Sequence, residues 1–271
     1  MLKVYLRPIY RMCKILWKIN LLKTCYVNFR KLPFLQAIHF PIYVYGPLKI
    51  DTLRGKIIID HPIVSGMIII GYDIDATPYS GLKTRLTLHG SMTFKGYAVI
   101  GRGVTVISYG EIEIGNCCTI GGGSLIKGME KITIGDNTRI TFSCIVFDSN
   151  IHFIKNIETG KVGRNTLPIV IGKNCWINSG AFISKGSVIP DYSIVGRNSI
   201  VNKDYSQCGA NLYLAGAPAK VLSSNVQRIF SIVEERKLND YFRLHLNENF
   251  IELETGLMDE PGNEDYFRWL I

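Results

Sequence analysis

Residues 171–201, IGKNCWINSGAFISKGSVIPDYSIVGRNSIV, carry an aliphatic side chain at every sixth position. The series is Ile171, Ile177, Ile183, Ile189, Val195 and Val201, and a small side chain lies two positions before each of the last five, at Cys175, Ala181, Ser187, Ser193 and Ser199. This period fits neither a helical turn nor the simple alternation of an isolated strand. It is typical of short strands and turns that stack as a parallel β-helix.

The same spacing extends toward the N-terminus with two slips of two residues. The members are Ile58, Val64 and Ile70, then Leu82, Leu88, Phe94, Ile100, Val106 and Ile112, then Ile114, Ile120 and Ile126, and finally Ile134, Ile140 and Val146. Glycine follows many of these aliphatic residues, which predicts corners with permissive backbone angles. We expect a mainly β fold with the coils in residues 51–222, an N-terminal segment in 1–50, and a helix with an acidic tail in 223–271.

The N-terminal segment, residues 1–50, contains nine basic residues and no acidic residue. Met12, Ile15, Leu16, Ile19 and Leu22 have helical spacing, which predicts a basic amphipathic helix over residues 9–26. This helix either packs on the body of the protein or contacts an anionic membrane surface through residues 1–31. Its lysines interrupt the apolar run of a signal peptide or a membrane span. We therefore expect a cytoplasmic protein, with peripheral membrane association as an alternative.

The net charge of +9 resides mainly in this segment, so a nucleic-acid partner is not predicted. Toward the other end, Ser223 is a candidate cap for a helix that continues to Leu238. The seven cysteines are an odd number without the spacing of a disulfide framework. Cys118, Cys144 and Cys175 occupy small positions of the ladder, which predicts buried structural thiols and a reducing compartment.

The motif Ile171-Gly172-Lys173-Asn174-Cys175-Trp176-Ile177 resembles the signature of the hexapeptide-repeat acyltransferases. The pieces 180–183, 186–189, 195–204 and 215–220 continue the resemblance, which is closest to sugar O-acetyltransferases that decorate bacterial surface polysaccharides. It is close over residues 114–222, looser over 58–113, and absent from both ends. It implies a left-handed parallel β-helix, a homotrimer with sites between subunits, and direct transfer of an acetyl group from acetyl-coenzyme A to a saccharide or nucleotide-sugar acceptor.

The ladder is interrupted at residues 148–168, and the resemblance implies that His152 in this interruption is the general base. Imidazole titrates near neutral pH and can take the proton of a hydroxyl as it attacks a thioester. Asp148 and Asn150 are expected to orient His152 or the acceptor. The implied coenzyme-binding residues are Trp176, Ser179, Arg197, Asn202, Lys203 and Lys220, of which the lysines suit phosphate oxygens. No metal is expected.

Two departures from the family pattern keep an alternative open. Asn178 occupies a position where the family commonly has glycine, and the run 121–123 is Gly-Gly-Gly where some relatives have an asparagine that steadies the oxyanion. A non-catalytic trimeric scaffold or binding module is therefore the second interpretation. A zinc carbonic anhydrase on the same coil would need three converging histidines, and the ladder region offers His89 and His152 far apart.

Overall fold

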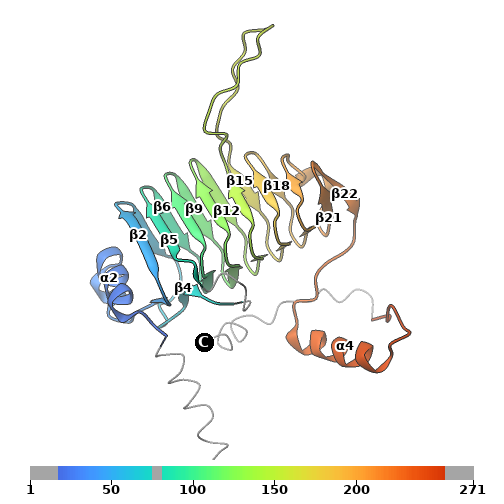
Figure 1. The fold of residues 1–271 in the computed structure, drawn as a ribbon, viewed down its shortest axis with the longest axis horizontal. Coiled ribbons are helices and arrows are strands. Elements are labelled where there is room, and N and C mark those ends of the chain that lie inside the picture. Colours follow the sequence, from blue (N-terminus) through green and yellow to red (C-terminus); the bar gives the residue numbers. More distant parts are fainter. Residues whose placement is uncertain (1–17, 75–80, 254–271) are drawn as a thin grey trace, which may run out of the picture.

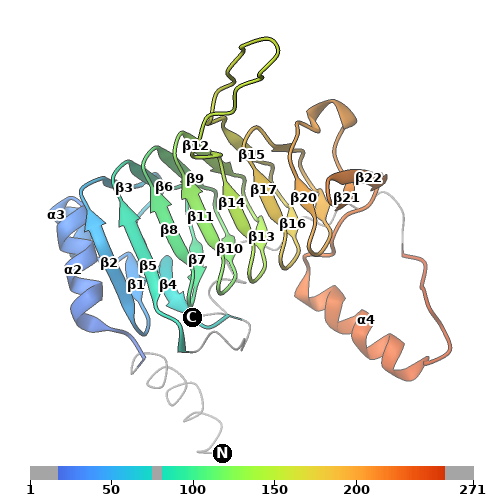
Figure 2. The same ribbon diagram turned by 45° about the horizontal axis from the view of Figure 1, so that its top comes forward.

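A computed structural model describes residues 18–74 and 81–253, in which short strands wind into a three-sided, left-handed parallel β-helix (Figures 1 and 2). Every third strand belongs to the same sheet, except that the last two strands of the chain both join the nine-stranded sheet. The nine-stranded sheet contains β1 (Ile42–Val44), β4 (Ile68–Tyr72), β7 (Ala98–Gly101), β10 (Cys118–Ile120), β13 (Arg139–Ile140), β16 (Trp176–Ile177), β19 (Ile194–Val195), β21 (Tyr213–Gly216) and β22 (Ala219–Ser223).

The other two sheets complete each coil. The seven-stranded sheet contains β2 (Leu48–Leu53), β5 (Thr84–Leu88), β8 (Thr105–Ser108), β11 (Leu125–Gly128), β14 (Ile145–Phe147), β17 (Phe182–Ser184) and β20 (Ile200–Val201). The six-stranded sheet contains β3 (Lys56–Ile59), β6 (Ser91–Phe94), β9 (Glu111–Ile114), β12 (Lys131–Ile134), β15 (Ile169–Ile171) and β18 (Val188–Ile189). A short 3₁₀ helix, η2 (Ser206–Cys208), follows β20. The predicted fold class is confirmed.

The six-residue ladder forms the core. All six aliphatic residues of the 171–201 series are buried, and so are the five small residues that precede them. Full burial of one such aliphatic side chain contributes roughly 1.5–3 kcal/mol. The small residues lie inward as well, and their size leaves room at each corner of the triangle for the larger aliphatic side chains. Cys118, Cys144 and Cys175 are buried as predicted.

The two slips in the ladder reflect a change in coil length. Ile100 pairs with Ile120 and Ile120 with Ile140, whereas Ile177 pairs with Val195. The early coils therefore contain two more residues than the late ones, and these residues widen the corner between the seven-stranded and six-stranded sheets. At this corner the ring of His89 stacks on the ring of Tyr109, with 4.7 Å between the centroids.

Three expectations for the N-terminal coils were wrong. Ile58, Val64 and Leu82 are 43%, 41% and 48% exposed. Ile58 points outward because the inward positions of β3 are Ile57 and Ile59, and Val64 and Leu82 lie between strands. The coils also begin at β1, upstream of the expected boundary at residue 51.

The glycines that follow the aliphatic residues are required by close packing between coils, and not by the permissive backbone angles that we expected. Of these, only Gly71 has a left-handed backbone among the described residues, at φ +85°. In the later coils the left-handed residue comes two positions after the glycine, as at Asn137 and Asn174. Gly121 is needed because a Cβ there would lie 2.5 Å from the carbonyl carbon of Thr141 in the next coil.

The first coil is covered by α2 (Leu21–Lys31), which is followed by α3 (Phe34–Ala37). The Asn28 side chain donates to the carbonyl of Ile42 at 2.7 Å and accepts from its N–H at 3.2 Å. Thr24 Oγ1 accepts from the N–H of Val44 at 3.0 Å. These bonds satisfy the free edge of β1, which would otherwise be a template for pairing with another chain.

The expected helix over residues 9–26 is only partly testable, because residues 1–17 lie outside the described residues. Residues 21–26 are helical as predicted, but Ile19 forms a β-bridge with Tyr45, so that the helix starts after Asn20 and continues beyond residue 26 to Lys31. The Asn20 side chain caps the helix by accepting from the N–H of Lys23 at 3.1 Å.

The C-terminal helix also begins later than expected. Ser223 ends β22, which pairs antiparallel with β21 and closes the last coil. The helix is α4 (Ile232–Leu244), and its cap is Ser231, whose hydroxyl accepts from the N–H of Glu234. An extended segment sets α4 apart from the coils (Figure 1). Across residues 18–74 and 81–253, no helix combines the length and the apolar character that a bilayer span requires.

Candidate functional site

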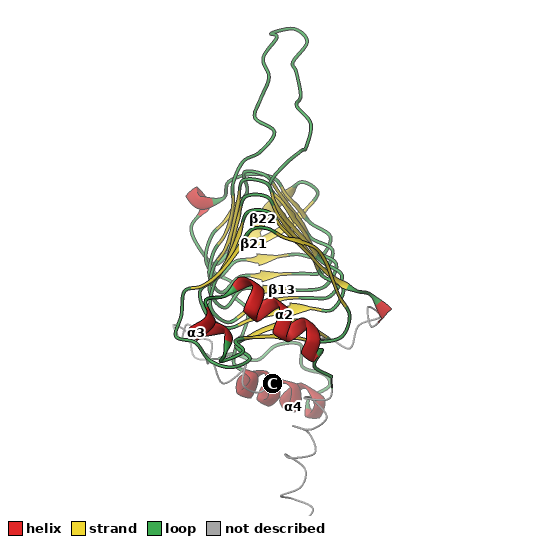
Figure 3. Ribbon diagram, turned by 90° about the vertical axis from the view of Figure 1, so that its left-hand side faces the viewer, coloured by secondary structure: helices red, strands yellow, loops and turns green. Residues whose placement is uncertain are grey.

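The interruption of the ladder is a long hairpin that projects from the corner between the seven-stranded and six-stranded sheets (Figure 3). It leaves the coil after β14 and returns at β15. Ser149 forms a bridge with Thr166, and the N–H of Asn150 donates to the carbonyl of Asn165 at 2.8 Å. The two arms are thus held together at their root.

Asp148 fixes the point where the hairpin leaves the coil. Its buried carboxylate accepts from the backbone N–H groups of Met129, Glu130 and Lys131 at 2.7, 2.8 and 2.8 Å. One coil earlier, the N–H groups of this corner donate to carbonyls of the following coil, as Tyr109 does to Gly128. Because the chain departs at Asp148, the carboxylate replaces those missing carbonyls. Asp148 therefore anchors the hairpin and does not face an acceptor, contrary to expectation.

The returning arm is fixed by Glu130 of the preceding coil. Its carboxylate accepts from Thr166 Oγ1 at 2.7 Å and lies 3.3 Å from the guanidinium of Arg164. The ammonium group of Lys185, from the following coil, donates to the carbonyl of Arg164. The hairpin root is therefore tied to the coils on both sides.

His152 lies near this root in an open pocket of about 430 Å³. The chain turns sharply before it, with Ile151 at φ +65° and its N–H donating to Ser149 Oγ at 2.8 Å. Such a conformation in a β-branched residue is uncommon and requires support from its surroundings. The pocket brings together the predicted residues Asn150 and His152, and its other lining residues are Ile154, Asn156, Lys161, Gly163, Arg164 and Lys185. Among the described residues, none forms a hydrogen bond with the imidazole.

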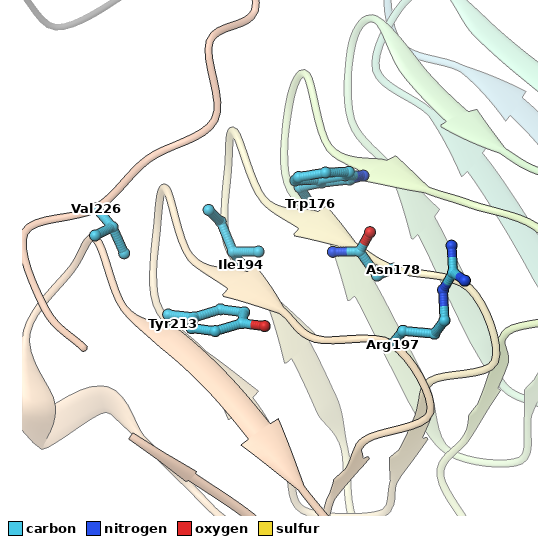
Figure 4. A pocket seen from close by; sticks show the side chains of 6 residues that line it. All are labelled: Trp176, Asn178, Ile194, Arg197, Tyr213 and Val226. Atoms are coloured by element: carbon cyan, nitrogen blue, oxygen red, sulfur yellow. The ribbon is translucent and has the colours of Figure 1, made fainter. Parts of the chain in front are cut away.

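A second open pocket of about 440 Å³ lies on the outer face of the nine-stranded sheet (Figure 4). Its wall is a row of outward side chains in register, in which Trp176 pairs with Ile194 and Ile194 with Tyr213. Asn178 and Arg197 form the polar side, and the Asn178 amide donates to the carbonyl of Val195 at 3.0 Å. An apolar wall with a few polar groups at its edge is typical of a small-molecule site.

The chain that follows β22 crosses this wall as a strap, residues 226–230. The N–H of Val226 donates to the carbonyl of Asn211 at 3.1 Å. The guanidinium of Arg228 lies 5.1 Å from the ring centre of Trp176 and 5.3 Å from that of Phe230. Arg228 also lies 3.4 Å from the carboxylate of Glu235 on α4.

Sequence reasoning missed several residues of this pocket. Ile194 and Tyr213 could have been found, because each precedes an inward aliphatic residue and so points outward, as Trp176 does. Val226, which also lines the pocket, and Arg228, which contacts Trp176 from the strap, lie beyond the repeat, and no periodic signal marks them.

Of the expected coenzyme-binding residues, the structure brings together Trp176 and Arg197. The other four do not line this pocket. Ser179 is buried, and its carbonyl accepts from the N–H of Asn198 at 3.0 Å. Asn202 and Lys203 follow β20, where the Lys203 ammonium lies 5.2 Å from the ring centre of Tyr205, and Lys220 lies in β22.

The two pockets share no lining residue. In the triangular section of the coil, the corner that carries the hairpin lies opposite the nine-stranded sheet (Figure 3). His152 and Trp176 of one chain therefore belong to opposite sides of the β-helix.

The buried thiols are poor candidates for a covalent nucleophile. Burial raises the pKa of Cys118 and Cys175 to about 12 and that of Cys144 to about 11. A thiol with such a raised pKa carries almost no thiolate near neutral pH. Within the described part of the chain, no three His, Cys, Asp or Glu side chains cluster as metal ligands would.

No protein-family model matches the chain. WcaF of Escherichia coli K12, assigned to colanic acid biosynthesis as an acetyltransferase, is 29% identical over 145 residues, which are 54% of this chain and 65% of WcaF. Galactoside O-acetyltransferase of the same organism is 36% identical over 95 residues, or 34% of this chain and 43% of that enzyme. The chain thus spans less than two thirds of the length of either relative.

Among solved structures, the polysialic acid-specific acetyltransferase NeuO aligns with 79% of this chain and 91% of its own, at 20% identity and a TM-score of 0.44. The sequence similarities confirm the resemblance to sugar O-acetyltransferases of the hexapeptide-repeat type.

Proposed function

We propose that this protein is an acetyl-coenzyme A-dependent O-acetyltransferase that modifies a hydroxyl of a sugar or of a surface-polysaccharide precursor. The observation that carries the proposal is the exposed His152 at the root of the hairpin, held in one pocket with Asn150 on a hexapeptide coil. The similarity of the coil to galactoside O-acetyltransferase supports it.

In this reaction His152 is the general base. A ring nitrogen takes the proton of the acceptor hydroxyl while the hydroxyl oxygen attacks the thioester carbonyl carbon. The carbon–sulfur bond then breaks, coenzyme A leaves as the thiolate, and the proton passes from the imidazolium to the sulfur. General-base assistance of this kind contributes on the order of a hundred- to ten-thousand-fold in rate.

The groove on the nine-stranded sheet fits a coenzyme. Trp176, Ile194 and Tyr213 offer an apolar wall for the pantetheine arm, and the Arg197 guanidinium suits a phosphate. We also assign coenzyme contacts to Ser179, Asn202, Lys203 and Lys220. Because these four residues do not line the groove, their contacts would be made outside it.

Because His152 and Trp176 lie on opposite sides of one chain, a complete site needs a second copy. We infer a homotrimer in which the hairpin of one subunit meets the nine-stranded sheet of its neighbour. The free thiols of the described cysteines fit a cytoplasmic protein, where such thiols remain reduced.

The test is release of coenzyme A from acetyl-coenzyme A in the presence of a panel of saccharides and nucleotide sugars. His152→Ala should lower the rate at least about a hundredfold while the oligomer persists. His89→Ala, which alters an exposed histidine at a corner of the coil, is the matched control and should retain activity. Undiminished turnover in His152→Ala would contradict the mechanism. If no member of the panel is acetylated and coenzyme A produces no thermal shift, the scaffold interpretation is favoured.

A further inference from the structure

The N-terminal end of the β-helix carries an exposed apolar surface. Helix α2 buries Thr24, Val27 and Asn28, and the two polar side chains among them bond to β1. Its outward face carries Leu21, Leu22 and Phe29 instead, and Leu22 is 85% exposed. Most of the large apolar side chains of α2 thus face outward, whereas a surface helix usually buries its apolar side.

Helix α3 extends the same surface. The ring of Phe29 lies 6.2 Å from that of Phe34, which links the two helices. Leu35 and Ile38 follow, and Leu35 is 77% exposed. We define the α2–α3 patch as Leu21, Leu22, Phe29, Phe34, Leu35 and Ile38. Contiguous exposed apolar surface of this kind marks an interaction site more often than scattered single residues do.

The charge around the patch identifies the partner. Lys18, Lys23 and Arg30 lie on or beside α2, whereas the Lys31 ammonium donates to the carbonyl of Gly55 at 2.7 Å, and residues 1–50 contain no acidic residue. A second copy of the same surface would bring like charges together. An anionic lipid surface instead offers an apolar interior for the leucines and phenylalanines, and negative headgroups for the lysines and arginines.

We propose that the α2–α3 patch docks this protein on the surface of an anionic membrane, without spanning it. Both helices lie at one end of the β-helix, away from the hairpin and from β21 and β22 (Figure 2). In the proposed homotrimer, with its three-fold axis along the coils, the three patches would face the same way and bind together. The contact uses residues 18–38 and does not depend on the acetyltransferase proposal.

The test is co-sedimentation of the full chain with vesicles of phosphatidylcholine alone or mixed in equal parts with phosphatidylglycerol. We expect binding to the anionic vesicles, and weaker binding as salt is raised, because the Debye length falls to about 3 Å near 1 M. The variant Leu22→Glu/Leu35→Glu should bind at least tenfold more weakly. Leu244→Glu/Leu246→Glu is the matched control, since these leucines are 75% and 85% exposed on and after α4, and should bind as the wild type does.

Equal vesicle binding by both double variants would overturn the proposal, because it would place the lipid contact elsewhere in the chain. Absence of binding by the wild type would overturn it too. A change of oligomeric state in Leu22→Glu/Leu35→Glu alone, measured by light scattering, would show that the patch contacts a second copy and would equally overturn it.

Discussion

The guanidinium of Arg228 lies over the indole of Trp176, 5.1 Å from the ring centre, and so joins the chain after β22 to the wall of the groove. Cation–π contacts at exposed sites contribute about 0.5–1 kcal/mol. Arg228→Ala should therefore open the strap about two- to fivefold more often, which limited chymotrypsin cleavage after Phe230 would detect. Arg243→Ala, which removes a cation paired with Asp240 on α4, should leave the rate of cleavage unchanged.

Asp148 should be the residue of the hairpin whose loss costs most stability. Asp148→Ala leaves three part-buried N–H groups without their acceptor, so we expect a loss of about 3 kcal/mol or more in the free energy of unfolding, measured with urea. Asp148→Asn keeps one acceptor oxygen and should lose less. Asp60→Ala removes a carboxylate exposed to solvent and should change stability little. A loss for Asp148→Ala no larger than that for Asp60→Ala would disprove the anchor role.

The wide corner of the early coils should not tolerate a side chain at Gly90. A Cβ there would lie 1.9 Å from the carbonyl oxygen of Gly110 in the next coil. Gly90→Ala must push the coils apart, and we expect it to destabilise the protein by about 1–3 kcal/mol. Gly81→Ala is the control, since a Cβ at Gly81 meets nothing within 4 Å. Equal melting temperatures for the two variants would mean that the corner can relax.

The buried thiols should make the fold sensitive to alkaline pH. Burial raises the pKa of Cys144 to about 11 from an ordinary value of 9.0, and those of Cys118 and Cys175 to about 12. As pH rises, the unfolded chain therefore loses the thiol protons before the folded protein does. The contribution of the protonated thiols to the free energy of unfolding is complete below about pH 9 and is lost as pH rises toward about 11 and 12. Cys144→Ala should lose less stability than the wild type between about pH 8 and about pH 11, measured by urea unfolding. Cys25→Ala, at an exposed cysteine, should follow the wild type.

Much of the fold could be predicted because the coil is a local repeat. The inward position recurs every six residues from Ile171 to Val201, and each such residue meets its equivalent in the next coil. The prediction failed where several adjacent residues are equally apolar, as at Ile58, whose neighbours Ile57 and Ile59 lie inward instead. Helix ends were also displaced, since Asn20 and Ser231 act as caps only once the flanking chain has its tertiary position.

The candidate site was predictable only in part. The motif indicated His152, Asn150, Trp176 and Arg197, and the structure places them in two pockets. The motif could not indicate Arg228, because residues 226–230 lie outside the repeat and contact Trp176 only in the folded protein. Nor could it show that Asp148 serves the backbone, since an aspartate before a loop has the same appearance whether it binds a ligand or a row of N–H groups.

The sequence by itself determined the coil, because a period of six and the small residues between the aliphatic ones encode contacts between neighbouring turns of the chain. Only the tertiary structure decided what lies on the outside. It placed His152 and Trp176 on opposite sides of one chain and turned the large apolar side chains of α2 outward. These positions depend on packing between segments that are distant in the sequence, and the period of the repeat contains no information about such packing.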